Sequence, residues 1–404
     1  MNDELVYKGD TTQTYAMSMA ATWICAPAIF VASSMAYYNG LYGFLWFLIP
    51  NVLTLLLFGY FAQYFVSSNG KDSFIGIPDL FVDNRRQSII HSVVSAILLI
   101  NSTCIQILGL HALLQIYFPD IYIGLSAVIV SLFCYIYTKC GGIKVCIISD
   151  KYKYLITLTI CILLIILSCN TIDFSKVTLF GVNNPDFIDI SLSFGVISAI
   201  GLMGAPYADS TFWQRVFSTD KRSVLKMFCQ SGLYFMLVPL CFGIIGFLYT
   251  STGFVEGWEI TKAFEGNLLL SGSLSVAVFC VLVATLDSNL CAIHALSKRT
   301  MNVSSSMEML LLLTIIFIIT FEPTIVQMFL IYGTTRCAVA IPTMLTICER
   351  YDKSRLFYST IIALVIGVGG FVAMKLLNLP YGYVFTIFAF TFPLVGYSSS
   401  SKHK

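Results

Sequence analysis

Long apolar stretches separated by short polar segments run through almost the whole chain. Residues 11–70 contain no Asp, Glu, Lys or Arg, and Asn39-Gly40 divides this stretch into two helical lengths. A helix needs about 20 mostly apolar residues to cross a bilayer, because unsatisfied backbone groups are too costly in lipid. The pattern predicts twelve membrane-spanning helices, near 15–38, 41–66, 88–117, 121–138, 143–169, 189–217, 224–250, 268–297, 307–321, 324–348, 356–377 and 382–397.

Composition agrees with an all-α membrane protein and excludes several classes of function. The 404 residues are 57% hydrophobic and only 11% charged, whereas soluble proteins carry about 25% charged residues. A net charge of +2 without a basic block gives no sign of nucleic-acid binding. The 13 cysteines form no CxxC pair, and no ATP-binding GxxxxGK[ST] loop occurs. Any transport must therefore use an ion gradient or be passive.

Basic residues alternate between the two sides of the predicted membrane segments. With the N-terminus in the cytoplasm, nineteen Lys and Arg lie on the cytoplasmic side and only Lys176, Lys262 and Lys375 lie outside, while Arg336 lies within a span. Basic residues are enriched in cytoplasmic loops. The sequence thus predicts a cell-membrane protein (plasma or inner membrane) with a cytoplasmic N-terminus over 1–14 and a cytoplasmic tail over 398–404.

Two spans carry prolines near their middle, at Cys25-Ala26-Pro27 and within Gly201–Pro206. Proline removes a backbone donor, so nearby carbonyls are left for an ion or a substrate. The two breaks fall at matching places in two halves, 15–169 and 189–348, followed by two additional helices over 356–397. This arrangement is typical of inverted-repeat transporters with a central site. Ordinary proline kinks would explain the same residues.

Four segments, in this order, resemble the sodium/solute symporter family, whose members have the leucine-transporter fold. They are Ala21-Thr-Trp-Ile-Cys-Ala-Pro27, Gly141-Gly-Ile-Lys-Val-Cys-Ile-Ile-Ser-Asp150, Asp209-Ser-Thr-Phe-Trp-Gln-Arg215 and Ala284-Thr-Leu-Asp-Ser288. The resemblance implies a core of 5+5 inverted-repeat helices with broken helices 1 and 6. It also implies sodium-coupled symport of a small polar solute by alternating access. The Asp209–Arg215 segment is similar to that of the urea-transporting branch, which usually has Gln where Ser210 stands.

The resemblance implies a sodium site between helices 1 and 8. Its ligands would be the carbonyls of Ala21, Ile24 and Val281 and the hydroxyl of Thr285, because sodium prefers oxygen ligands. The family's neighbouring serine is Ala284 here, so one hydroxyl is missing. Alternatively, Thr285 bonds back to its own helix, as membrane Ser and Thr often do.

Asp287 lies at the centre of a predicted span, where a carboxylate is expensive and needs a partner. Some family members hold a second sodium at this helix face, which suggests a second cation site formed by Asp150, Asp287 and Ser288. Two neighbouring carboxylates would repel unless a cation or proton lay between them. The alternatives are pairing of Asp150 with Lys153 and of Asp287 with His294. Coupling to H+ instead of Na+ through the same carboxylates also stays open.

The expected substrate path lies beside the two breaks, and its candidate residues are Trp23, Gln106, Tyr207 and Asp209. Gln106 belongs to a polar stripe on the third helix, and such stripes face protein or water. Each residue has a structural alternative. Gln106 would link two helices, Asp209 would cap the second half of helix six, and the aromatic residues would pack.

These features predict a transporter and not an enzyme, because the chain has no HExxH pair and its histidines are scattered. The expected partners are a small solute such as urea, a sugar or an amino acid, and the lipid bilayer. No nucleic acid and no obligate protein partner are expected. A non-transporting membrane sensor on the same fold is the alternative function.

Overall fold

The computed structural model describes residues 7–69, 84–170, 172–256, 258–300, 305–321, 323–377, 379 and 381–398, and they are almost entirely helical. Of the expected tails at 1–14 and 398–404, residues 1–6 and 399–404 lie outside this part of the chain, and 12–14 belong to the first helix. The helices are α1 Thr12–Trp23, α2 Ala26–Asn69, α3 Arg85–Leu114, α4 Ile123–Cys169, α5 Phe187–Ile190, α6 Val196–Ala208, α7 Ser210–Ser218, α8 Val224–Tyr249, α9 Ile260–Ala263, α10 Leu268–Thr300, α11 Ser306–Phe321, α12 Ile325–Ile347, α13 Lys353–Ile362, α14 Gly369–Leu376 and α15 Gly382–Thr391. Two π-helical segments, η3 Ser191–Gly195 and η6 Ala363–Val368, join α5 to α6 and α13 to α14.

The prediction of twelve spans is confirmed. Within the described ranges, eight helices are long and apolar enough to cross a membrane, and Ser306–Phe321 and Gly382–Gly396 are shorter apolar helices. Two of the eight are divided by a glycine with non-helical backbone angles, Gly40 in α2 (φ 61°, ψ −151°) and Gly142 in α4 (φ 58°, ψ −168°). Each glycine lies where the sequence predicted a boundary between two spans. With both helices divided in this way, the eight long helices and the two shorter ones make up the twelve predicted spans.

Gly40 shows why a glycine is needed at such a turn. Its positive φ is a conformation that L-residues with a side chain rarely adopt. A Cβ added there would also lie 2.3 Å from the backbone carbon of Phe180. The neighbouring Leu41 N–H donates to the carbonyl of Leu179 at 2.8 Å. The turn therefore packs directly against the backbone of the segment that follows α4.

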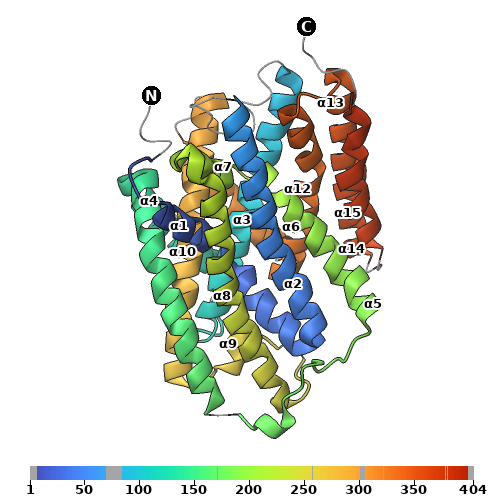
Figure 1. The fold of residues 1–404 in the computed structure, drawn as a ribbon. Coiled ribbons are helices and arrows are strands. Elements are labelled where there is room, and N and C mark those ends of the chain that lie inside the picture. Colours follow the sequence, from blue (N-terminus) through green and yellow to red (C-terminus); the bar gives the residue numbers. More distant parts are fainter. Residues whose placement is uncertain are drawn as a thin grey trace.

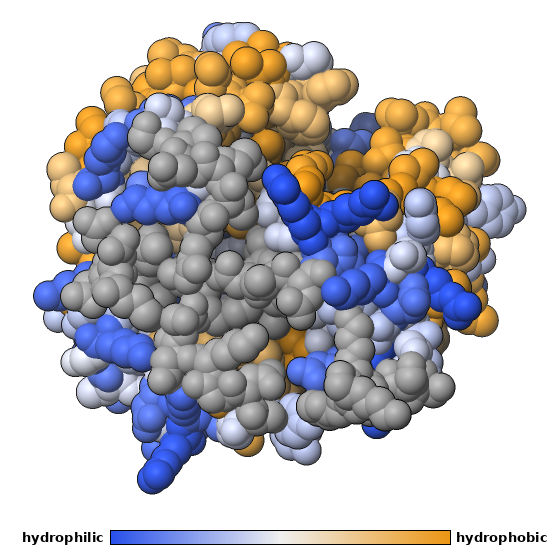
Figure 2. Space-filling view, turned by 90° about the horizontal axis from the view of Figure 1, so that it is seen from above, coloured by the Kyte–Doolittle hydropathy of each residue, from blue (hydrophilic) through white to orange (hydrophobic). Residues whose placement is uncertain are grey.

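The outside of the bundle has the character of a lipid-facing surface. Large hydrophobic side chains of α4 and α11 are exposed, and the most apolar stretch of α4 is only 28% buried. The chain begins and ends at the same end of the bundle (Figure 1). Seen from that end, hydrophilic side chains lie among hydrophobic ones that form much of the rim (Figure 2). The protein is thus an integral membrane protein.

The interrupted helices lie at the centre of the bundle. α1 packs against α4, α8 and α10, and α6 packs against α12 and α2. The first interruption falls at Ile24 and Cys25, as the sequence predicted. The second does not fall within Gly201–Pro206. α6 continues through Pro206 to Ala208, and the interruption lies only at Asp209 (φ −99°, ψ 116°), between α6 and α7. The division of the chain into repeats over 15–169 and 189–348 stays a prediction.

Candidate functional site

The break after α1 frees two backbone carbonyls. In a continuous helix, the N–H groups of Cys25 and Ala28 would bond to Ala21 and Ile24. Here the Cys25 N–H donates to Trp23 O at 2.9 Å, and the Ala28 N–H donates to Cys25 O at 2.8 Å. The carbonyls of Ala21 and Ile24 are thereby released from their helical partners. These are two of the carbonyls that the resemblance implies as sodium ligands, at the end of α1 and directly after it.

The break between α6 and α7 is stabilised by Asp209 itself. Its Oδ1 accepts from the Thr211 N–H at 3.0 Å and from the Thr211 hydroxyl at 2.7 Å. This is an N-cap interaction, which satisfies a backbone donor at the start of α7. Since the capping oxygen is Oδ1, the second oxygen of Asp209 is free to face the other side of the break.

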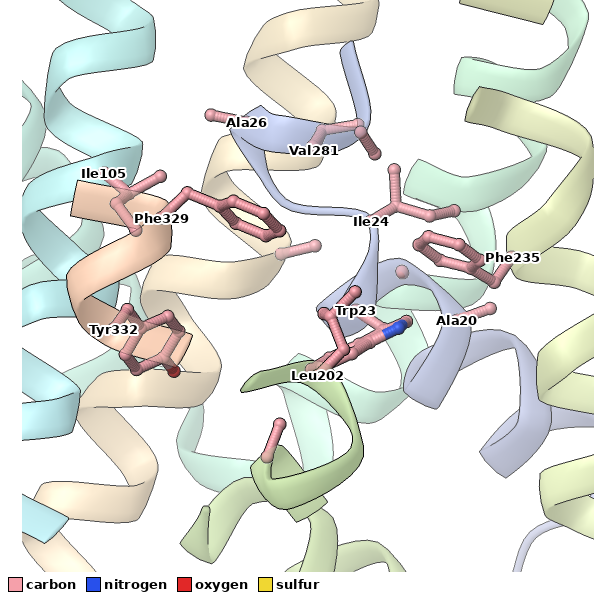
Figure 3. Close-up of a cluster of buried hydrophobic side chains, with 14 of the residues drawn as sticks. Ala20, Trp23, Ile24, Ala26, Ile105, Leu202, Phe235, Val281, Phe329 and Tyr332 are labelled. Carbon is pink, nitrogen blue, oxygen red and sulfur yellow. The ribbon is translucent and has the colours of Figure 1, made fainter. Parts of the chain in front are cut away.

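A small cavity lies between the two breaks. Its volume is about 30 Å³, which leaves room for about two water molecules. Figure 3 shows Trp23, Phe329 and Tyr332 around the space beside the interrupted first helix. The polar residues that line the cavity are Thr22, Asn51, Ser102, Gln106, Asp209, Thr211, Thr285, Tyr332 and Arg336, and the aromatic ones include Trp23, Phe47, Phe212, Phe235 and Phe329.

A buried ion pair forms one wall of this cavity. Arg336 Nη2 lies 3.1 Å from Asp209 Oδ2, and the two side chains are only 4% and 7% exposed. The Tyr332 hydroxyl donates to the same oxygen at 3.2 Å. The Arg336 guanidinium also lies 3.3 Å from the centroid of the Tyr332 ring, a cation–π contact. The opposite charges cancel, so the wall offers hydrogen-bonding groups without net charge.

Gln106 connects α3 to the break between α1 and α2. Its Oε1 accepts from the Ala26 N–H at 2.9 Å, and its Nε2 donates to the carbonyl of Ser102 at 3.2 Å. The Ala26 N–H is one of the orphan donors at the start of α2. Gln106 therefore links two helices, and it also lines the cavity.

The two predicted aromatic residues differ in position. Trp23 lines the cavity and is 6% exposed. Its ring packs edge-to-face against Phe212, with 5.0 Å between the ring centroids. Within the described part of the chain, its indole Nε1 has no hydrogen-bond partner. Tyr207 is not among the lining residues and packs edge-on against the rings of Phe58 and Phe61. The structure therefore does not bring Tyr207 into the candidate site.

A second, smaller cavity of about 10 Å³ lies behind the first break. Ala21, Ile24 and Val281 border it, together with Lys153, Ala284 and three other residues. Three of the four expected sodium ligands thus come together around a space for about one water-sized sphere. The fourth, Thr285, borders the larger cavity instead.

Thr285 joins the same two helices. Its hydroxyl lies 3.2 Å from Thr22 O on α1 and 3.3 Å from Val281 O on its own helix. The back-bonding alternative is therefore present together with the contact to α1. Because a hydroxyl keeps two lone pairs as acceptors, these contacts leave the Thr285 oxygen able to ligate a cation.

The three residues of the expected second cation site also come together, with two basic side chains among them. Lys153 Nζ lies 3.3 Å from Asp150 Oδ1 and 2.6 Å from Asp287 Oδ2. Arg215 Nη2 lies 3.6 Å from Asp150 Oδ2 and donates to the Ser288 hydroxyl at 2.7 Å. The alternative pairing of Asp150 with Lys153 thus occurs, and Asp287 pairs with the same ammonium group.

Side chains of α1 complete this network. The Ser18 hydroxyl donates to Asp150 Oδ2 at 2.8 Å, and the Thr22 hydroxyl lies 3.1 Å from that of Ser288. Arg215 Nη2 donates to the Thr22 hydroxyl at 3.0 Å. The network therefore connects α1, the second half of α4, α7 and α10.

Comparison with solved structures identifies the architecture. A substrate-bound, outward-open Na+-coupled sialic acid symporter is similar over 98% of this chain and 90% of its own, with a TM-score of 0.70 at 16% identity. Mhp1, a nucleobase-cation-symport-1 family transporter, in a closed conformation with bromovinylhydantoin bound, covers 97% of this chain and 94% of its own, with a TM-score of 0.56 at 12% identity. A mutant of the manganese transporter of Eremococcus coleocola covers 97% of this chain and 89% of its own, with a TM-score of 0.54 at 13% identity. The chain has the leucine-transporter fold. No family model and no curated protein matches it.

The sequence alone does not show which partners three basic residues have. The side chains of Lys153, Arg215 and Arg336 are at most 14% exposed. Their acidic partners are up to 134 positions away in the sequence. The available signal was Arg336 itself, because a base inside a membrane span faces the protein interior and needs a partner.

Proposed function

We propose that the protein is a secondary active transporter that carries a small polar organic solute by alternating access, coupled to a cation. The observation that carries the proposal is the cavity bordered by both interrupted helices, together with the second cavity that the residues with released carbonyls border. Discontinuous helices around a central site are the usual binding-site arrangement of secondary transporters. The coupled transport of sialic acid by the similar symporter supports the same class of function.

The lining of the larger cavity indicates which solute it would accept. The Asp209–Arg336 pair leaves the wall without net charge, and amide, hydroxyl and aromatic groups supply the remaining surface. A neutral or zwitterionic solute with hydrogen-bonding groups fits this chemistry better than an anion or a cation. Urea, a sugar and an amino acid are the candidates that we propose to test, with Trp23, Gln106 and Asp209 as solute contacts. A sugar or an amino acid is larger than two water molecules and requires the cavity to widen.

We propose Na+ as the coupling ion, bound at the small cavity by the carbonyls of Ala21, Ile24 and Val281. The hydroxyl of Thr285, which lies 3.3 Å from the Val281 carbonyl, would be the fourth ligand. The carbonyls of Ala21 and Ile24 have lost their helical hydrogen bonds, which makes them available to a hard cation. Coupling to H+ is the alternative. The proposed location is the plasma or inner membrane with both termini in the cytoplasm.

Uptake of radiolabelled urea, sugars and amino acids into proteoliposomes tests this function. An inward Na+ gradient should drive accumulation of at least one solute, and Thr285→Ala should reduce the sodium dependence. Thr314→Ala is the matched control, because the Thr314 hydroxyl also bonds back to its own helix, at 2.8 Å, but lies in α11 and lines neither cavity. If uptake ignores both Na+ and pH gradients, coupled transport is wrong. Binding without counterflow of labelled solute would indicate a sensor.

A further inference from the structure

The ammonium group of Lys153 lies between two carboxylates that come from different helices. Asp150 and Lys153 stand one turn apart on α4, and Asp287 faces them from α10. Both carboxylate side chains are 0% exposed, and the Lys153 side chain is 14% exposed. The Tyr137 ring lies on another side of the ammonium, 5.1 Å from its nitrogen to the ring centroid. Buried carboxylates this close to each other require a cation for charge balance.

The existing partners already supply that balance. Lys153 and Arg215 carry two positive charges against the two negative charges of Asp150 and Asp287. Each of the four carboxylate oxygens also has a partner. Lys153 contacts one oxygen of each group, Ser18 and Arg215 contact the second oxygen of Asp150, and Ser288 contacts the second oxygen of Asp287 at 3.4 Å.

We propose that Lys153 is a tethered cation that takes the position at Asp150 and Asp287 which a free metal cation would otherwise occupy. At these two carboxylates the ammonium group of Lys153 provides the positive charge that a second sodium ion was expected to provide. Combined with the proposed function, on which this part rests, the inference limits metal-ion coupling to the small cavity. The cluster itself then contributes a fixed charge and not a transported one.

The same residue borders the small cavity beside Ala21, Ile24 and Val281. A sodium ion in that cavity would therefore lie next to a positive charge. The repulsion is tolerable only while Asp287 and Asp150 hold and neutralise the ammonium, because an uncompensated charge in a low-dielectric interior acts strongly on its neighbours. Lys153 thus sets the ion preference of both positions.

Thermal unfolding of the purified full-length protein tests the proposal, with NaCl replaced by choline chloride at constant ionic strength. Lys153→Met should create a site for Na+ at the two carboxylates. Its melting temperature should then rise more steeply with Na+ than that of the wild type. Above the dissociation constant of the new site, each tenfold increase in Na+ should raise the ratio of folded to unfolded protein by about a further tenfold. Lys153→Arg keeps the charge and should behave like the wild type.

Two further variants separate the cluster from general charge effects. Lys139→Met removes another cation from α4, one whose pair with Glu308 is exposed, and should not change the sodium dependence. The double variant Lys153→Met with Asp287→Asn removes one charge of each sign and leaves Asp150 beside Arg215. It should fold and show the sodium dependence of the wild type.

Equal sodium dependence of Lys153→Met and the wild type would overturn the proposal. If Lys153→Met does not fold at any Na+ concentration, the double variant decides. The proposal stands if the double variant folds with the sodium dependence of the wild type, and it fails if the double variant does not. In Lys153→Met, a sodium dependence weaker than that of the wild type would overturn it as well, because removing the ammonium would then not have opened a site for Na+ at the two carboxylates. These measurements need neither solute nor transport, so their failure is distinguishable from a failure of the proposed transport function.

Discussion

The Asp209–Arg336 pair offers a direct test of how the candidate solute cavity is built. Arg336→Met removes the cation but keeps most of the apolar stem. The Asp209 carboxylate then remains buried by its own surroundings, since it is only 7% exposed in the intact site. Asp209→Asn makes the opposite change, and the double variant removes both charges together.

Breaking a buried pair on one side costs about 3–5 kcal/mol, because one charge is left without its partner. Asp209 keeps its bonds to Thr211 and to the Tyr332 hydroxyl, so Arg336→Met belongs at the lower end of this range. With an unfolding entropy of about 2.1 cal/mol/K per residue, 404 residues give roughly 0.8 kcal/mol/K. The single variants should therefore melt about 4–6 °C lower, while the double variant should lie within about 1 °C of the wild type.

Intrinsic tryptophan fluorescence during heating, in one detergent and buffer, measures all four proteins of the cycle. Lys139→Met and Glu308→Gln provide the same cycle for an exposed pair, whose side chains are 55% and 42% exposed, and should show far smaller coupling. The reasoning is refuted if Arg336→Met and the double variant melt at the same temperature. The charge of Asp209 would then not depend on Arg336.

Three other predictions concern single residues of the scaffold and the cavity. Gly40→Ala should destabilise the protein by at least about 1 kcal/mol because of its positive φ and its contact with Phe180. Gly272→Ala, with open space around the new Cβ, should stabilise it by roughly 0.5–1 kcal/mol; thermal unfolding compares them, and equal melting points would contradict the argument. Trp23→Phe removes no hydrogen bond among the described residues, since the indole N–H has no partner there, so it should lower the melting temperature only through the packing that the smaller ring loses against Phe212. It should weaken solute binding in calorimetry about tenfold by removing a hydrogen bond to the solute. Gln106→Leu should cost about 1–3 kcal/mol because it leaves the first N–H of α2 unsatisfied, and an unshifted melting curve would exclude that role.

The spans and their boundaries were predictable because they depend on local features. Asn39-Gly40 and the glycine pair 141–142 interrupt otherwise apolar stretches, and the positive φ of Gly40 and Gly142 follows from what glycine alone tolerates. The break at Cys25 was likewise marked by Pro27. A helix boundary that depends on a few consecutive residues can be predicted without knowing the fold.

The second break and the charge network were harder to predict. Pro206 is accommodated in the last turn of α6, and the break moves to Asp209 because that side chain caps α7. The sequence placed Asp150 and Asp287 together through the resemblance. It did not show that Lys153 lies between them, because that position depends on how α4 is rotated against α10. Pairings across helices are set by packing, which no local pattern records.

The contacts that hold α1 also constrain how the protein can be made. Ser18 bonds to a residue 132 positions later, and Thr22 to one 266 positions later. At synthesis rates of about 5–20 residues per second, the partner of Thr22 emerges roughly 13–50 s after Thr22 itself. During that interval the polar side chains of the twelve-residue helix α1 lack their final partners on α10. The contact between α1 and α10 can therefore form only after most of the chain has been synthesised.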